Sequence, residues 1–128
     1  MRLVESADTD FLYHVTDGAV VHLILDEGIE PGYWGTLPVI RYYISMRLVN
    51  EPVVFRVPFS AFNPSYLEAD LKGIQDPPSA EVTGMTEDEV SDAWDASGQS
   101  WQDSLKLIGS VRYGMHIAVT MKNLYLAK

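Results

Sequence analysis

A short apolar run that carries a histidine and leads into an amphipathic segment constrains this chain more than any other stretch. Residues 11–15 read Phe-Leu-Tyr-His-Val and predict a strand. The carboxylate of Asp17 can accept the unpaired amide hydrogens of a first helical turn, so a helix is expected to begin there. Gly28 supplies the left-handed residue that ends many helices, and Pro31 prevents continuation. The strand end therefore presents His14 where a binding site is readily built.

The pattern that follows predicts an alternation of helices, loops and short strands. In the first helix, Val20, Leu23 and Ile24 recur at i, i+3 and i+4 and are expected to face the core. In the second, apolar residues share one face, although its β-branched and aromatic residues would also suit a strand. The expected elements are an aromatic loop at 32–36, a helix at 37–48 whose alternative is a strand, a strand at 53–57, a turn with one helical turn at 62–71, and a loop at 73–84.

Two helix starts are strongly marked in the C-terminal half. Thr86 and Glu89 form a capping box, in which the hydroxyl and the carboxylate each satisfy a free backbone amide. Ser100 is expected to cap a further helix that ends at Gly109. The side chains expected to face inward are Val90, Ala93 and Trp94 in the first helix and Trp101, Leu105 and Ile108 in the second. Strands are expected at 110–113 and 123–127, with an edge strand around Leu3 and Val4.

The order of these elements predicts an α+β fold, a small split antiparallel-rich sheet with flanking helices. The 128 residues suit one domain, 1–128. An apolar content of 47% is enough for a packed core and too high for a disordered chain.

Charge and composition narrow the classes of function. The chain has 9 Lys and Arg against 18 Asp and Glu, a formal net charge of -9, so nucleic acid is not expected as a partner. It has no cysteine, which excludes disulfides and thiolate metal sites. No pair of histidines has metal-ligand spacing with a carboxylate, and no metal site is predicted. We see no signal peptide and no apolar run of membrane length, so a cytoplasmic, non-membrane protein is expected.

Four segments in this order resemble the ADP-ribosyltransferase fold family. They are closest to its small bacterial and phage branches, whose first motif is Tyr-His-Val-Thr or similar. The likeness spans residues 11–127, nearly the whole chain. The segments that carry it are FLYHVT, LDEGIEPG, VVFRVPFSAFNP and WQDSLKLIGSVRYGMHI.

The resemblance implies that NAD+ binds in a cleft between two half-sheets. His14 would then hydrogen-bond the adenosine-side ribose, and Thr16 with the nearby backbone would hold the nicotinamide end. Tyr13 of the same motif belongs to this expected binding set, and Arg112 is expected to face a phosphate. The aromatic expected to stack on nicotinamide is Tyr43 or Tyr42, with Tyr33 and Trp34 of the loop at 32–36 as alternatives; that loop would act either as a lid or as a segment pinned by its two rings.

The sequence departs from the family at the position of its catalytic glutamate. The aligned residue is Ser110, which has no charge to offer the ribose cation that forms as nicotinamide leaves. The closest acid upstream is Asp103, about two helical turns away. RNA 2'-phosphotransferases share the fold but need more basic residues than this chain has.

Two functions are therefore expected from different classes. The first is an NAD+-binding ADP-ribosyltransferase-like protein, a divergent mono-ADP-ribosyltransferase whose acceptor the sequence does not name. The alternative is a catalytically inactive module of the same fold, an interaction or inhibitor protein that presents its acidic surface to a basic partner.

Overall fold

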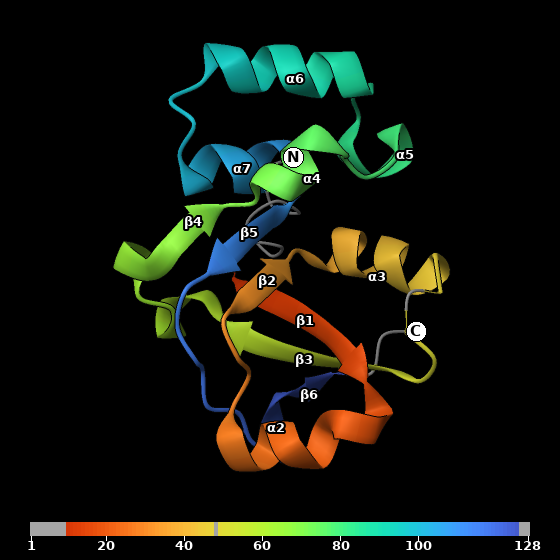
Figure 1. The fold of residues 1–128 in the computed structure, drawn as a ribbon, viewed down its shortest axis with the longest axis vertical. Coiled ribbons are helices and arrows are strands. Elements are labelled where there is room, and N and C mark those ends of the chain that lie inside the picture. The colour runs from red at the N-terminus through yellow and green to blue at the C-terminus, as the bar shows by residue number, and fades with distance from the viewer. Residues whose placement is uncertain (1–9, 48, 126–128) are drawn as a thin grey trace.

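The computed structural model describes residues 10–47 and 49–125, and it confirms the predicted α+β class. The described strands form one six-stranded sheet in the order β4-β5-β2-β1-β3-β6, and each neighbouring pair is antiparallel (Figure 1). The strands are β1 (Phe11–Asp17), β2 (Gly32–Gly35), β3 (Pro52–Pro58), β4 (Leu67–Ala69), β5 (Ser110–Tyr113) and β6 (Leu124–Tyr125).

Helices flank this sheet at both ends and on one side. Helix α7 packs against β4 and β5, and α4, α5 and α6 each contact α7, whereas α2 lies at the opposite end and α3 packs beside β1 (Figure 1). The α-helices are α2 (Val21–Glu27), α3 (Leu37–Ser45), α4 (Leu71–Gln75), α5 (Ala80–Thr83), α6 (Glu87–Ala96) and α7 (Trp101–Ile108). The 3-10 turns are η1 (Gly18–Val20), η2 (Phe59–Ala61), η3 (Pro64–Tyr66) and η4 (Met121–Asn123). In the described part of the chain, no helix has the length and apolar character needed to cross a bilayer.

The sheet is joined weakly at its centre. Strand β1 pairs with β3 along its whole length, and β2 pairs with β5 in the same way. Between β1 and β2, both fully described, the register holds a single pair, Tyr13 opposite Gly35. The halves β4-β5-β2 and β1-β3-β6 therefore diverge on either side of this point, which places His14 at the divergence.

The first helix begins later than the sequence predicts. Asp17 is a cap as expected, but its Oδ1 accepts from the Ala19 amide at 3.0 Å and so opens the 3-10 turn η1. The α-helix starts only at Val21, which shifts its inward face by one residue. Val20 and Leu23, predicted to be inward, are 37% and 47% exposed. Ile24 packs against the core as predicted, and its neighbours there are Val21 and Leu25. Gly28 ends the helix at a φ of 86°, as predicted.

The prediction of a loop at 32–36 is wrong, because residues 32–35 form a central strand of the sheet. The side chains of β2 alternate in strand fashion, with Tyr33 46% exposed and Trp34 only 1% exposed. A side chain on Gly35 would approach the Gly109 carbonyl to 3.0 Å, so the glycine allows close backbone packing. A strand hydrogen-bonded on both sides cannot act as a lid, so the lid interpretation of these aromatics is also wrong.

The capped helices and most strands agree with the sequence. The helix predicted at 37–48 is observed at Leu37–Ser45, and the predicted capping box at Thr86 forms. Ser100 caps its helix as predicted, and does so in a capping box with Asp103. Of the predicted inward residues, Val90, Trp94 and Ile108 are buried. The strands predicted at 53–57 and 110–113 are present, and 123–127 contains the short strand Leu124–Tyr125. The edge strand predicted around Leu3 and Val4 lies outside the described residues.

The segments predicted as a turn at 62–71 and a loop at 73–84 are more ordered than expected, and the second contains the end of α4 and the short helix α5. Leu67–Ala69 forms the edge strand β4, in which Glu68 pairs with Arg112 of β5. Helix α4 follows immediately, because Asp70 accepts a hydrogen bond from the Gly73 amide and caps the first turn. The junction of β4 and α4 thus places Asp70 next to β5.

Candidate functional site

A cavity lies where the two halves of the sheet diverge. It has a volume of about 420 Å³ and is lined by His14 of β1, Tyr33 and Trp34 of β2, Tyr43 of α3 and Ser110 of β5, among others. These residues come from four elements that are far apart in the sequence. The strand order, with β1 and β5 on the two sides of β2, brings them together.

A second cavity of about 440 Å³ adjoins the first. The two cavities share Tyr33, Tyr43 and Ser110 in their walls. The second adds Asp70 and Asp76 from the two ends of α4, with the exposed Lys72 between them. We call the two together the central cleft. It extends from His14 to α4, and we call the part near Asp70 and Asp76 its acidic end, although Lys72 also lies in that wall.

His14 is positioned by a bond that spans the split in the sheet. Its Nδ1 lies 3.0 Å from the backbone carbonyl of Tyr33. Because a carbonyl oxygen only accepts, Nδ1 carries the proton and Nε2 keeps its lone pair. Burial lowers the pKa of His14 from its ordinary value, while the hydrogen bond to Tyr33 opposes that shift. The neutral ring therefore offers Nε2 as an acceptor for a ligand hydroxyl.

The lowered pKa of His14 makes stability depend on pH. The unfolded chain takes up this proton more readily than the folded chain, so the unfolding free energy should fall as the pH drops below about 6.5. This contribution is complete above the unfolded pKa and is lost as the pH falls toward the folded pKa. Urea titrations between about pH 7.5 and 5.5 test it. The variant His14→Gln should show a flatter dependence, and identical curves for the two proteins would contradict the assignment.

Ser110 belongs to a buried network of three polar side chains. Its Oγ donates to Asp70 Oδ2 at 2.6 Å, and Asp70 Oδ1 accepts from the Gly73 amide at 2.9 Å. Ser104 Oγ accepts from the Asp70 amide at 2.9 Å and donates to the Ser110 carbonyl at 2.6 Å. Asp70, Ser104 and Ser110 are all buried. The position that the resemblance aligns with the family's glutamate thus holds a serine that is hydrogen-bonded to a carboxylate.

Sequence reasoning missed Asp70 and considered Asp103 instead. The Asp103 carboxylate takes part in the capping box of its own helix, where it accepts hydrogen bonds from the amide and the hydroxyl of Ser100. These hydrogen bonds lower the pKa of Asp103. Asp70 is 40 residues before Ser110 in the chain. The one local signal was its suitability as a helix cap with Gly73 three residues later.

The acidic end of the central cleft carries a negative field. Among the described residues, no Lys, Arg or His forms an ion pair with Asp70, whose partners are the neutral groups above. The field reaches Tyr43, whose pKa is raised first by burial and then by the charges of Asp70, Tyr42 and Asp76. The cap of α4 and the hydrogen bond from Ser110 stabilise the Asp70 carboxylate within the fold, and its place in the cavity wall also exposes a ligand to its charge.

The other predicted residues lie away from the central cleft. Tyr13 points to the opposite face of β1 from His14 and packs edge-on against Tyr125, with ring centroids 5.3 Å apart. Thr16 lines neither cavity of the cleft. Arg112 forms an ion pair with Glu68 at 3.1 Å on the exposed edge of the sheet. The structure therefore gathers His14, Tyr33, Trp34, Tyr43 and Ser110. It leaves these three residues outside, and Tyr42, the alternative to Tyr43, also lines neither cavity.

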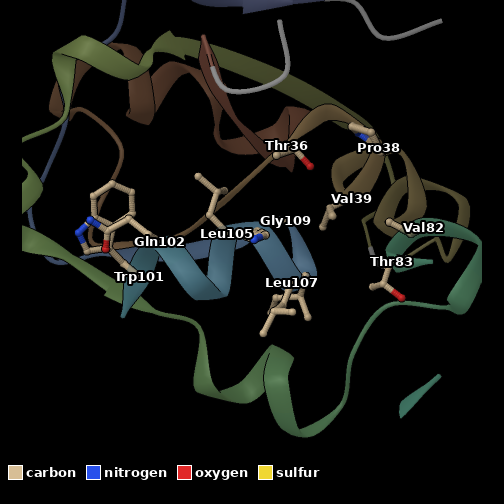
Figure 2. A pocket seen from close by; sticks show the side chains of 12 residues that line it. Thr36, Pro38, Val39, Val82, Thr83, Trp101, Gln102, Leu105, Leu107 and Gly109 are labelled. Atoms are coloured by element: carbon tan, nitrogen blue, oxygen red, sulfur yellow. The ribbon is translucent and has the colours of Figure 1, made fainter. Parts of the chain in front are cut away.

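A separate cavity of about 470 Å³, the helix pocket, lies between α7, the start of α3 and the end of α5. Figure 2 shows Leu105 and Leu107 of α7, Thr36 and Val39 near the start of α3, and Val82 of α5 around it. Its walls are mainly aliphatic, and it brings together no titratable pair. Although it is slightly larger than either cavity of the central cleft, it offers less chemistry, so we place the candidate site in the cleft.

Comparison with protein-family models, with curated proteins and with solved structures gave no match. Within the described residues, no group of three or more His, Asp or Glu side chains is arranged to hold a metal ion.

Proposed function

We propose that the central cleft binds NAD+ or a closely related nucleotide, and that the protein is a divergent ADP-ribosyltransferase-like protein. The observation that carries the proposal is the cleft itself. It opens at the split of the sheet and unites His14, Tyr33, Tyr43 and Ser110, which are four of the residues that the family resemblance implies.

The chemistry along the cleft supports a ligand of this kind. Nε2 of His14 can accept from a ribose hydroxyl, and the rings of Tyr33 and Tyr43 offer faces for a flat heterocycle. The nicotinamide ring of NAD+ is positively charged, which suits the end of the cleft near Asp70 and Asp76.

Calorimetric titration of the whole protein with NAD+ tests this proposal. Replacing His14 by Ala should weaken binding about tenfold, because one hydrogen bond to a ligand contributes about 1 to 1.5 kcal/mol. His22→Ala is a matched control, since His22 is exposed on α2 and distant from the cleft residues in the walls described above. No heat at millimolar NAD+, or equal affinity of wild type and His14→Ala, would overturn the proposal.

The alternative function has one specific observation in its favour. Helix α6 begins with Glu87, Asp88 and Glu89 and continues with Asp92 and Asp95, all exposed. This acidic face could meet a basic protein, and the net charge of -9 would speed the encounter. A protein of this type would bind its partner equally well with His14→Ala, so the same variant separates the two functions.

A further inference from the structure

We infer that Asp70, bonded beneath Ser110, is the residue that supplies negative charge to the ribose of NAD+ as nicotinamide leaves. The inference rests on the proposed function. It assigns the charge to a side chain at the junction of β4 and α4, although the strand position that would carry it by resemblance holds a serine.

Asp70 is in the right place for this role. Its side chain lines the same cavity as Tyr33, Tyr43 and Ser110. It is 4% exposed, so water screens its charge poorly. Its two oxygens are each held by a neutral donor, the Gly73 amide and the Ser110 hydroxyl, which fixes the carboxylate without cancelling its charge.

Ser110 links this charge to the cleft. The Ser110 hydroxyl donates a hydrogen bond to Asp70 Oδ2 at 2.6 Å. The lone pairs of its Oγ therefore remain available as acceptors for a ligand in the cleft. The hydrogen bond from Ser104 to the Ser110 carbonyl holds the start of β5 against α7. Ser110 is thus the group that contacts the ribose, and Asp70 acts both through it and by its field across the cavity.

The reaction that this arrangement assists has two steps: nicotinamide leaves the ribose, and an oxygen nucleophile then attacks the ribose carbon. The bond between ribose C1' and the nicotinamide nitrogen breaks, and its electron pair leaves with the nitrogen, which becomes neutral. The positive charge passes to the ribose. The oxygen of a water molecule, or of an acceptor, then forms the new bond to C1', and the proton that it loses goes to solvent. Nothing is oxidised or reduced, and a nearby carboxylate stabilises the cation between the two steps.

Nicotinamide release from NAD+, measured with the whole protein, tests the inference. Asp70→Asn keeps the shape and an acceptor oxygen but removes the charge, and should lower kcat about 100-fold, as for loss of one preorganised electrostatic group. The affinity for NADH, whose nicotinamide ring is neutral, should change less than about threefold, because the cleft keeps its geometry. Asp26→Asn, an exposed change on α2 with the same effect on net charge, should match wild type.

Ser110→Ala provides a second test that leaves the charge in place. It should lower kcat about tenfold, the amount expected for one hydrogen bond in the transition state. A kcat within fivefold of wild type for Asp70→Asn, or an unchanged kcat for Ser110→Ala, overturns the inference. Wild type that binds NAD+ but releases no nicotinamide above the rate in buffer also overturns it and leaves nucleotide binding intact. Absence of binding to both NAD+ and NADH overturns the proposed function and the inference together.

Discussion

Replacing Trp34 by Ala should lower the unfolding free energy by about 4 kcal/mol, as expected for removal of a large buried aromatic side chain. Trp34 is 1% exposed and packs edge-on against Phe62, with ring centroids 4.9 Å apart, while the His14 ring lies 5.2 Å away. Because domains of this kind are stable by about 5 to 15 kcal/mol, the variant should lose a large part of its stability. Urea unfolding followed by circular dichroism measures the loss.

Trp34→Phe is the matched control for this experiment. It keeps an aromatic ring against Phe62 and removes the indole N–H, which is buried without a partner among the described residues. Its cost should be about half that of alanine or less, since removing an unpaired buried donor is favourable in itself. If Trp34→Ala costs under about 1.5 kcal/mol, the ring does not anchor the sheet as the packing indicates.

Ser104→Ala should lower the unfolding free energy by about 2 to 3 kcal/mol, although alanine is the better helix former. Ser104 is completely buried in α7, and its hydroxyl serves both the Asp70 amide and the Ser110 carbonyl. The variant leaves a buried backbone donor unpaired and removes one bond from a buried acceptor. The same change should weaken NAD+ binding, because it loosens the junction of β4, α4 and β5 that forms the acidic end of the cleft.

Ser91→Ala controls for the change of residue type. Ser91 lies in the middle of α6 and is exposed, so its replacement should change stability by less than about 0.5 kcal/mol. Chemical denaturation of both variants at one pH gives the comparison. Equal stability of Ser104→Ala and wild type would mean that the buried network contributes little to the fold.

Local signals account for the elements that the sequence predicted well. The capping boxes at Thr86 and Ser100 and the positive-φ glycines Gly28 and Gly109 involve residues within a turn of each other. Such signals act over three or four residues and are visible in any window of the sequence. Periodicity also identified the helix at 37–48, of which Leu37–Ser45 is observed.

The missed elements depend on partners that are distant in the chain. Strand β2 has only four residues, two of them glycine, and is a strand because β1 and β5 flank it. Strand β4 has three residues and needs β5, with Leu67 opposite Tyr113. The inward face of α2 was misplaced because a 3-10 turn shifted the helix start, and periodicity alone does not distinguish the two phases.

Some residues of the candidate site could likewise be named from the sequence, whereas others were found only in the structure. The motif around His14 and the aromatics Tyr33 and Tyr43 could be named from the sequence, and the structure places all three at one cleft. The carboxylate bonded to Ser110 could not be found in that way. Distance along the chain pointed to Asp103, seven residues upstream of Ser110 by residue number, whereas the bonded acid is Asp70.

The stretch around His14 and the capped helices were thus determined by the sequence alone, because caps and turns are satisfied by neighbouring residues. The tertiary structure decided that β1 and β2 share a single register pair, and so opened a cleft beside His14. It also decided that Asp70 lies beneath Ser110. Both features arise from strand order and from the burial of polar groups that must find partners across the fold, and no local pattern of residues specifies those partners.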